Sequence, residues 1–183
     1  MRIVAGEKRG MTLLAPDGLD TRPTTDRVKE ALFSVIQFEV AGKTVLDLFA
    51  GSGALGIEAL SRGAGEAVFI DMDNRTIEII RKNLKKAGFT DKATIIKENY
   101  VDAIKLFQNT HKFDIVFVDP PYKSDYYAHA LMLLANEGAL HKNSVVIAEG
   151  EEPLQPGNWP YKIRKSKRYG KTFLTFLSYE GIE

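Results

Sequence analysis

The stretch Val45-Leu46-Asp47-Leu48-Phe49-Ala50-Gly51-Ser52-Gly53-Ala54-Leu55-Gly56 decides the fold of this chain of 183 residues. Its apolar first half predicts a buried β-strand, and the glycines after it predict a tight turn into a helix that continues through Leu60. Gly51, Gly53 and Gly56 have the GxGxxG spacing, in which missing Cβ atoms let a ligand approach the backbone and let the helix pack closely on its strand. Alone, this spacing is a weak signal of nucleotide binding.

Acidic residues near this stretch indicate what kind of ligand is bound. The next predicted strand, residues 66–71, brings Asp71 and Asp73 to its carboxyl end, where an acid can bind ribose hydroxyls. Asp47 stands four residues before Gly51, at a position that is normally apolar in a dinucleotide-binding strand because a buried unpaired carboxylate is costly. We therefore expect a cationic or hydrogen-bond-donating neighbour. A carboxylate that merely pairs with loop amides is the alternative for Asp47.

A second motif, Asp119-Pro120-Pro121-Tyr122, ends the apolar run of residues 115–118. Two prolines cannot continue a strand's hydrogen-bond ladder, so a rigid turn is predicted there. The Asp119 carboxylate and the Pro120 carbonyl can accept hydrogen bonds from an exocyclic NH2 group, and Tyr122 offers a face on which a heterocyclic base can stack. The motif therefore suits a planar amine, although a plain strand end with a turn is the simpler interpretation.

The remaining chain predicts alternating strands and helices. Strands are expected at 44–49, 66–71, 93–97, 113–118 and 143–149, and helices at 26–38, 53–62, 75–87, 100–108 and 125–136. Asn74 is the expected cap of the helix that Gly88 ends, and Thr24 or Thr25 caps the first helix. Two hairpins complete the pattern, residues 2–5 with 11–14 and 161–163 with 172–178.

This order predicts an α/β, Rossmann-like fold with a mostly parallel seven-stranded sheet, helices on both faces, and an amino-terminal β-hairpin and helix as an extension. The glycine turn, Asp71, the segment after Ile96 and Asp119 would then all lie at the carboxyl ends of strands, where such sheets bind ligands.

Composition supports one globular domain, residues 1–183, in which an extension at 1–40 packs on a core at 41–183. The chain is 44% hydrophobic and 27% charged, which is ordinary globular usage. The absence of cysteine excludes disulfides, thiolate zinc sites and cysteine nucleophiles, and the scattered histidines suggest no metal site. No long apolar segment indicates a membrane span or a leader, so we expect a cytoplasmic protein.

Charge is concentrated near the carboxyl end. The net charge is only +1, but residues 162–171 contain six lysines and arginines and no acid, interleaved with Tyr169. Such a segment can follow phosphates and stack on a base. An edge strand that is kept soluble by lysines is the alternative.

The motifs together resemble a known family. The glycine stretch with its leading acid resembles the class I S-adenosylmethionine-dependent methyltransferases. The segments 2–10 and 21–33, with Leu46-Asp-Leu-Phe-Ala-Gly-Ser-Gly53, Asp119-Pro-Pro-Tyr122 and Tyr169-Gly170, are similar to the RsmD-type bacterial 16S rRNA guanine-N2 methyltransferases over nearly the whole chain. This resemblance implies methyl transfer from S-adenosyl-L-methionine to N2 of guanine 966 of 16S rRNA, in a small-subunit ribosomal assembly particle.

The resemblance also implies site residues. The expected catalytic set is Asp119, Pro120, Pro121 and Tyr122. The expected cofactor-binding set is Asp47, Phe49, Ala50, Gly51, Ser52, Gly53, Asp71, Met72, Arg22 and Thr24, with Asn99 or Asp102 meeting the adenine. The expected RNA-binding set is Arg9, Arg27, Lys165, Lys167, Arg168 and Tyr169. Arg27 and Glu30 are alternatively exposed partners on a helix face.

Three other functions are considered. A DNA N6-adenine or N4-cytosine methyltransferase would use the same Asp-Pro-Pro-Tyr turn, but it usually carries a target-recognition region for which this chain has no room. An NAD-dependent dehydrogenase would leave Asp47 and Asp119 without a role. A catalytically silent RNA-binding assembly factor would not need the intact turn.

Overall fold

The computed structural model describes the chain except for residues 17–25, 109, 121–124, 156–158 and 182–183. Four predicted site residues, Arg22, Thr24, Pro121 and Tyr122, therefore lie outside the described residues, as does the expected helix cap at Thr24 or Thr25.

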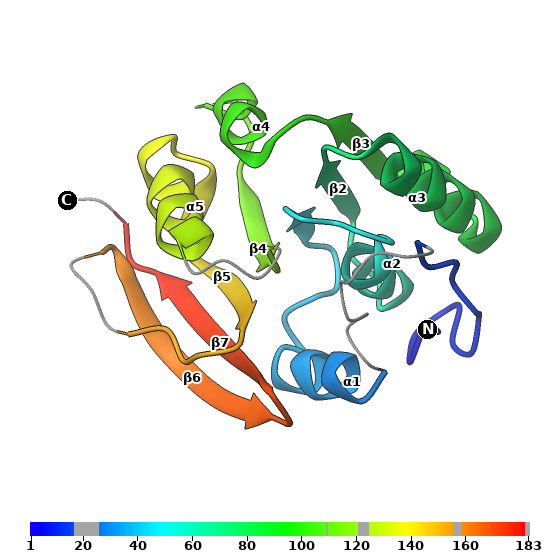
Figure 1. Cartoon of the computed structure of the whole chain (residues 1–183), viewed down its shortest axis with the longest axis horizontal. Helices are drawn as coiled ribbons and strands as arrows, with labels where there is room; N and C mark the ends of the chain where they lie inside the picture. The colour runs from blue at the N-terminus through cyan, green and yellow to red at the C-terminus, as the bar shows by residue number, and fades with distance from the viewer. Residues whose placement is uncertain (17–25, 109, 121–124, 156–158, 182–183) are drawn as a thin grey trace.

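The molecule is built on one seven-stranded sheet with the order β3-β2-β1-β4-β5-β7-β6 (Figure 1). The strands are β1 (Thr44–Asp47), β2 (Glu66–Asp71), β3 (Ala93–Lys97), β4 (Phe113–Val118), β5 (Leu140–Gly150), β6 (Tyr161–Tyr169) and β7 (Thr172–Tyr179). The first five run parallel, and β7 pairs antiparallel with both β5 and β6. The predicted seven-stranded, mostly parallel sheet is confirmed.

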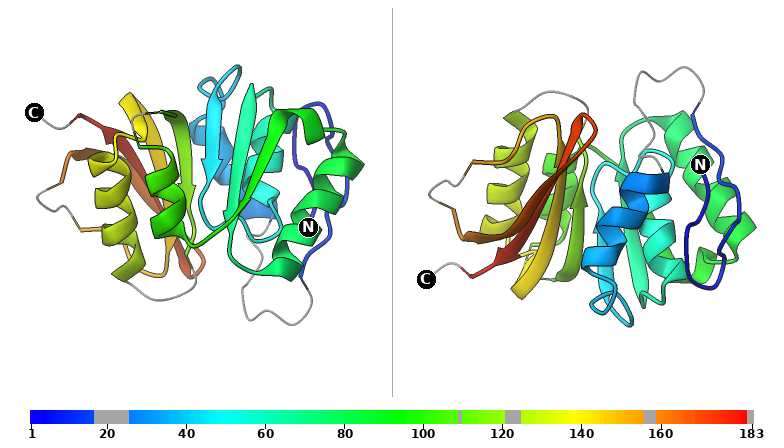
Figure 2. Two further views of the ribbon diagram at one scale, coloured as in Figure 1. Left: turned by 90° about the horizontal axis from the view of Figure 1, so that it is seen from above. Right: turned by 90° about the horizontal axis from the view of Figure 1, so that it is seen from below.

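Helices cover both faces of the sheet (Figure 2). On one face lie α1 (Asp26–Val35), α2 (Ala54–Ser61) and α3 (Asn74–Ala87), whose apolar side chains share one buried cluster with the strands. On the other lie α4 (Tyr100–Leu106) and α5 (Asp125–Asn136), whose apolar side chains belong to a second cluster. A short 3-10 turn, Thr90–Lys92, follows α3. In the described part of the chain, no helix has the length and apolarity needed to cross a membrane.

The ends of α3 test the predicted helix signals. Asp73, in an extended conformation, accepts a hydrogen bond from the Arg75 N–H and is the cap, so the prediction of Asn74 as the cap is wrong by one residue. An aspartate satisfies a free amide of the first turn as well as an asparagine does, so the neighbouring Asp73 takes this position instead. Gly88 ends the helix in the left-handed conformation, with φ of 73°, as predicted.

The amino-terminal hairpin is shorter than predicted. Its two arms are antiparallel, but they form a single bridge, between Arg2 and Thr12, instead of two regular strands. Beyond this short pairing, the N–H groups of Val4 and Ala5 donate to the Glu58 carboxylate of α2. The hairpin is thus bonded to the helix beneath it.

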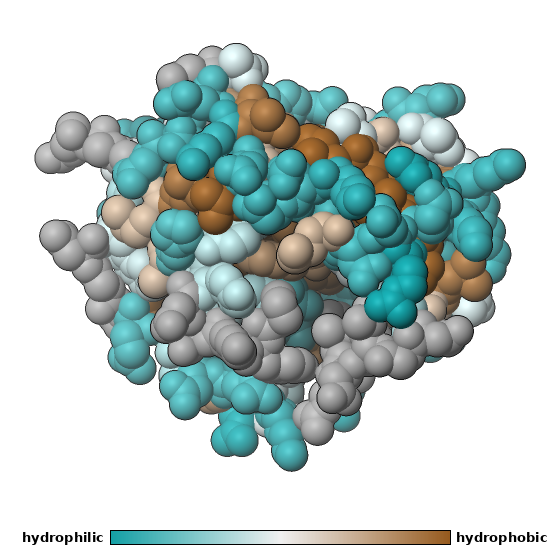
Figure 3. Space-filling model, turned by 45° about the horizontal axis from the view of Figure 1, so that its top comes forward, coloured by the Kyte–Doolittle hydropathy of each residue, from teal (hydrophilic) through white to brown (hydrophobic). Residues whose placement is uncertain are grey.

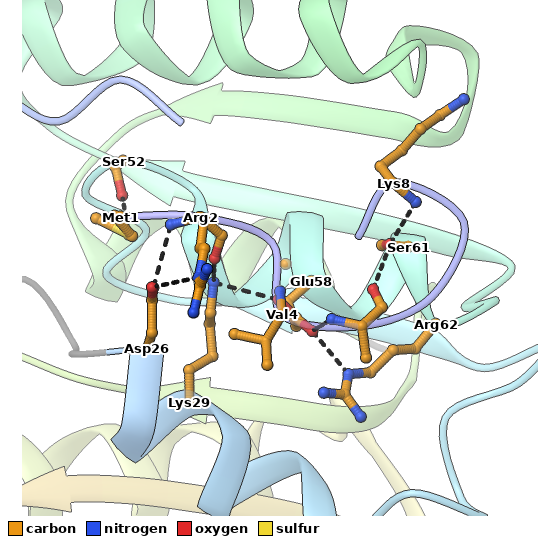
Figure 4. A network of polar contacts seen from close by, with 12 residues as sticks. Met1, Arg2, Val4, Lys8, Asp26, Lys29, Ser52, Glu58, Ser61 and Arg62 are labelled. Atoms are coloured by element: carbon orange, nitrogen blue, oxygen red, sulfur yellow. Dashed lines mark hydrogen bonds and ion pairs between the residues drawn. The ribbon is translucent and has the colours of Figure 1, made fainter. Parts of the chain in front are cut away.

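A buried ion cluster fixes the hairpin and α1 to α2 (Figure 4). Lys29 of α1 lies 3.2 Å from Glu58 of α2, both side chains are fully buried, and Arg62 contacts the same carboxylate at 2.8 Å. The Lys29 ammonium also donates to the Arg2 carbonyl. Buried charges are stable only when paired and hydrogen-bonded, and here the pairing holds three segments together.

Candidate active site

The carboxyl ends of β2, β1 and β4 bring the predicted motifs to one edge of the sheet (Figure 1). Residues 50–53, which we call the glycine loop, follow β1. The Gly51 N–H donates to the Asp71 carboxylate at 3.0 Å, and the Ala50 N–H donates to the Ile70 carbonyl at 2.9 Å. These bonds fasten the loop to the end of β2. Because β1 and β4 pair in parallel, Asp119 at the end of β4 lies at the same edge.

The three motif glycines serve different purposes. A Cβ atom on Gly51 would have the Phe49 carbonyl oxygen, 4.0 Å away, as its nearest neighbour, so this glycine borders open space. A Cβ atom on Gly56 would stand 2.3 Å from the Phe69 ring, so this glycine lets α2 pack against β2. Gly51 and Gly53 also have positive φ, 54° and 76°, which other residues rarely adopt. The spacing therefore builds both an approach to the backbone and a tight helix contact.

Asp47 lies beneath the glycine loop and is almost wholly buried. Its carboxylate accepts the Gly56 N–H at 2.9 Å, so the donor that the sequence required is a backbone amide of α2. Burial raises the pKa of Asp47 to about 7, because the hydrogen bond from Gly56 compensates only in part and the Asp71 carboxylate adds repulsion.

Asp71 and Met72 stand at the end of β2. Burial raises the pKa of Asp71, although its carboxylate accepts the N–H groups of Gly51 and Asp73. Met72, the next residue, has 70% of its surface exposed. A carboxylate can bind the hydroxyls of a ribose, and an exposed apolar side chain beside it can cover an adenine.

Asp119 and Pro120 occupy the end of β4. Loss of hydration raises the pKa of Asp119 well above its usual range, and the Glu149 and Asp47 carboxylates raise it further. Several carboxylates thus repel one another at this edge of the sheet. A ligand that brings positive charge or N–H donors would relieve that repulsion.

An aromatic group beside the glycine loop was not predicted. The Phe49 ring lies 5.2 Å from the Tyr100 ring, which lies 5.7 Å from the Tyr126 ring, and the Tyr100 hydroxyl is 2.7 Å from His129 Nδ1. These residues come from the glycine stretch, α4 and α5, and no sequence signal joins them.

Asn99 and Ser52, which are predicted to bind the cofactor, also have structural roles. Asn99 caps α4, and its side-chain oxygen accepts the N–H groups of Val101 and Asp102 at 3.0 Å each. The Asp102 side chain is 60% exposed, and its carboxylate accepts a hydrogen bond from the Asn99 side-chain amide at 2.6 Å. Ser52 is buried, and its hydroxyl faces the Met1 sulfur at 3.6 Å, as Figure 4 shows.

The predicted basic group on β6 is divided between two faces of the sheet. Lys165 and Lys167 pair with Phe176 and Leu174, which belong to the cluster on the α1 side. Arg168 is the next residue along the strand, so it projects from the opposite face. The two lysines therefore lie on the face of β6 opposite to that of Arg168.

Two basic residues of β6 contact other side chains. Lys167 stacks on the Tyr169 ring at 5.3 Å, and Arg164 forms a bidentate ion pair with Glu39, with both N–O distances 2.9 Å. Of the predicted amino-terminal contacts, Arg9 in the hairpin turn and Arg27 in the first turn of α1 are both exposed.

The strand order, the glycine loop after β1 and the acid at the end of β2 are the construction of a class I S-adenosylmethionine-dependent methyltransferase. The chain belongs to the RsmD family. The family model described as "Conserved hypothetical protein 95" matches residues 1–178.

Relatives and solved structures agree with this placement. The chain is 39% identical to "Ribosomal RNA small subunit methyltransferase D" of Escherichia coli strain K12, over 87% of this chain and 81% of that protein. It is 37% identical to the protein of the same name from Haemophilus influenzae, over 87% and 84%. The solved structure of "Putative methyltransferase yhhF" from Escherichia coli is similar with a TM-score of 0.89 and 34% identity, covering 100% of this chain and 99% of that one.

Proposed function

We propose that this protein methylates N2 of guanine 966 of 16S rRNA within a small-subunit assembly particle in the cytoplasm. The observation that carries the proposal is the position of Asp119 and Pro120 at the end of β4, beside the strand that bears the glycine loop. The names of the relatives described above support rRNA as the substrate.

We also propose that residues 1–183 act as one domain, because the Lys29–Glu58 cluster ties the extension at 1–40 to the core at 41–183.

The cofactor side of the site follows from the open face of the glycine loop. In this proposal Asp71 binds the ribose, and Gly51 and Gly53 let the methionine part approach the backbone. Asp47, beneath the loop, favours a positively charged ligand. S-adenosylmethionine supplies a sulfonium methyl group as the electrophile.

Other predicted cofactor residues surround these. Phe49, Ala50 and Met72 provide apolar surface, and Asp102 or Asn99 meets the adenine. Arg22 and Thr24, also predicted to bind the cofactor, lie outside the described residues. The fit rests on chemistry that the chain offers at this edge: carboxylates with raised pKa values, an open glycine and an exposed methionine.

The substrate side depends on Asp119. A guanine amine is a poor nucleophile because its lone pair is delocalised into the ring. A carboxylate and a carbonyl that accept its two N–H bonds favour a more tetrahedral nitrogen and aim its lone pair. Asp119 can then take the proton that the methylated nitrogen releases, which a raised pKa favours. Since a paired base hides its amine, the guanine must be unpaired or flipped out, and Tyr122 would stack on it.

Labelled S-adenosylmethionine tests the proposal. The protein is incubated with small-subunit particles lacking the modification, with naked 16S rRNA, or with genomic DNA, and the labelled nucleoside is identified after digestion. We expect N2-methylguanosine at position 966, formed in the particles. Label confined to DNA adenine or cytosine, or at another rRNA position, would refute the proposal.

The variant Asp119→Ala tests the role of the carboxylate. We expect methyl transfer to fall by about a hundredfold or more, as for removal of a positioning group, while S-adenosylmethionine affinity stays within a few fold of wild type. Asp114 is an acid at the opposite end of β4, so the variant Asp114→Ala is the matched control and should retain activity. An equal loss of cofactor affinity in Asp119→Ala would place this residue on the wrong side of the site.

RNA binding is proposed for the predicted basic residues, and the two faces of β6 can be separated experimentally. If Lys165 and Lys167 hold phosphates, changing both to glutamine should reduce the slope of log affinity against log salt by about 1.4 for single-stranded RNA. Arg168→Gln reports on the opposite face, and Arg9→Gln and Arg27→Gln report on the amino-terminal face. An unchanged slope in the double variant would assign these lysines to protection of the strand edge instead.

A further inference from the structure

Asn83, on the buried face of α3, makes more polar contacts than helix packing requires. Its amide nitrogen donates to the Ser52 carbonyl at 2.9 Å and to the Leu14 carbonyl at 3.0 Å. Its side-chain oxygen accepts the Leu14 N–H at 2.8 Å. The side chain is wholly buried, so it has no water to replace these partners. One side chain therefore joins α3, the amino-terminal segment and the glycine loop.

The Ser52 carbonyl is a sensitive place for such a contact. Ser52 lies between Gly51 and Gly53, two residues with positive φ, and glycine backbones cost the most conformational entropy to hold in one arrangement. The hydrogen bond that the Asn83 amide donates to the Ser52 carbonyl restricts the loop at its centre. The loop is already fastened at Ala50 and Gly51 by bonds to the end of β2, so Asn83 supplies the contact on the side of α3.

The amino-terminal segment reaches the same loop residue from a second direction. The Met1 sulfur lies 3.6 Å from the Ser52 hydroxyl (Figure 4). This segment is held in turn by the Lys29–Glu58 cluster and by bonds from Val4 and Ala5 to Glu58. A displacement of the hairpin would therefore be transmitted to Ser52 through Asn83 and Met1.

We infer that Asn83 is a positioning residue for the cofactor: it holds the glycine loop in its binding conformation and makes that conformation depend on the docked amino-terminal segment. The inference rests on the proposed cofactor role of the loop and goes beyond it, because Asn83 itself is not expected to touch the ligand. Ordering the loop before binding removes an entropy cost from the binding step.

The test uses the near-isosteric variant Asn83→Asp. An ionised carboxyl group can donate neither of the two bonds, and a protonated one can donate only one, whereas the bond from Leu14 N–H is retained. Asn83→Ala removes all three. Ser144→Ala is the matched control, since its buried hydroxyl donates to the Phe113 carbonyl at 2.7 Å at the opposite edge of the sheet.

Titration calorimetry with S-adenosylmethionine and with S-adenosylhomocysteine measures affinity, at a temperature where melting curves show each variant to be folded. We expect Asn83→Asp to raise the Kd for both ligands by about fivefold or more, within the range of one to two lost hydrogen bonds. KM for S-adenosylmethionine should rise similarly, with a smaller change in kcat at saturation. Ser144→Ala should lower the melting temperature without changing either Kd.

The result that would overturn the inference is a wild-type Kd in both Asn83 variants, or an equal rise in Ser144→Ala. Affinity needs no RNA, so this outcome is separate from failure of the proposed function. A protein that binds S-adenosylmethionine through this loop but methylates another nucleic acid would retain the Asn83 effect.

Discussion

Replacement of Asp47 by asparagine should stabilise the protein while weakening its cofactor site. Burial raises the pKa of Asp47 from an ordinary value of 3.8 to about 7, so at pH 8 the folded protein holds a buried, incompletely compensated charge. A shift of about three units corresponds to about 4 kcal/mol. Asparagine retains an oxygen that can accept the Gly56 N–H and carries no charge.

The raised pKa of Asp47 determines how the stability difference between the variant and the wild type changes with pH. A carboxyl group whose pKa is raised on folding stabilises the fold fully below its unfolded pKa of about 4, and that contribution is lost as the pH rises through about 7. Asp47→Asn should therefore be more stable than wild type by up to about 4 kcal/mol at pH 8 but by only about 1.5 kcal/mol at pH 5, where folded Asp47 is protonated.

Urea denaturation of the ligand-free protein at pH 5 and pH 8 measures both differences. Calorimetry at pH 8 should show weaker S-adenosylmethionine binding by Asp47→Asn, since the positive ligand loses a carboxylate partner. A variant that is destabilised at pH 8, or that differs from wild type equally at both pH values, would refute the reasoning.

Asp114→Asn is the control, because its effect on stability should have the opposite direction. Burial alone would raise the pKa of Asp114, but hydrogen bonds from the Thr44 N–H and the Lys43 ammonium outweigh it and hold the pKa below its ordinary value. This variant should therefore lose stability at pH 8, and the loss should shrink as the pH falls through the folded pKa.

Three further predictions concern packing, charge and rate. Gly56→Ala should lower stability by about 1–3 kcal/mol in urea titrations, because the new Cβ would stand 2.3 Å from the Phe69 ring. Lys29→Met should cost about 3–5 kcal/mol, because Glu58 stays buried with one cation fewer, whereas the exposed Lys82→Met should cost little. At saturating cofactor and RNA the methylation rate should fall as the pH is lowered, because protonated Asp119 accepts N–H bonds poorly; a rate independent of pH would contradict this role.

Local patterns in the sequence were sufficient for the fold. The expected strands at 66–71, 93–97 and 113–118 have the predicted bounds, because apolar runs of strand length end at turn residues. The helix at 125–136 also has its predicted bounds. The strand at residues 140–150 begins earlier than predicted because Leu140 already pairs with Phe113 of β4. The polar residues His141, Lys142 and Asn143 lie in the irregularity between that pair and the pair of Ile115 with Val145, which hides the early start from a sequence pattern.

The candidate site was predictable where it lies on strand ends. Asp47, Gly51, Asp71 and Asp119 belong to four local motifs, and a parallel sheet places the carboxyl ends of its strands together whatever the remaining packing. The acids at that edge could therefore be listed before the structure was known. Their raised pKa values could not, because burial and mutual repulsion depend on distances between strands.

Contacts between distant side chains required the tertiary structure. Asn83 and Leu14 are 69 residues apart, and Lys29 and Glu58 lie on two helices whose docking angle no local pattern specifies. A lysine or an asparagine on a helix is normally exposed, so the sequence alone favours the wrong environment for both. The faces of Lys165 and Arg168 were likewise decided by the bulge between Ile163 and Lys165, because one extra residue in a strand exchanges the side on which every following side chain lies.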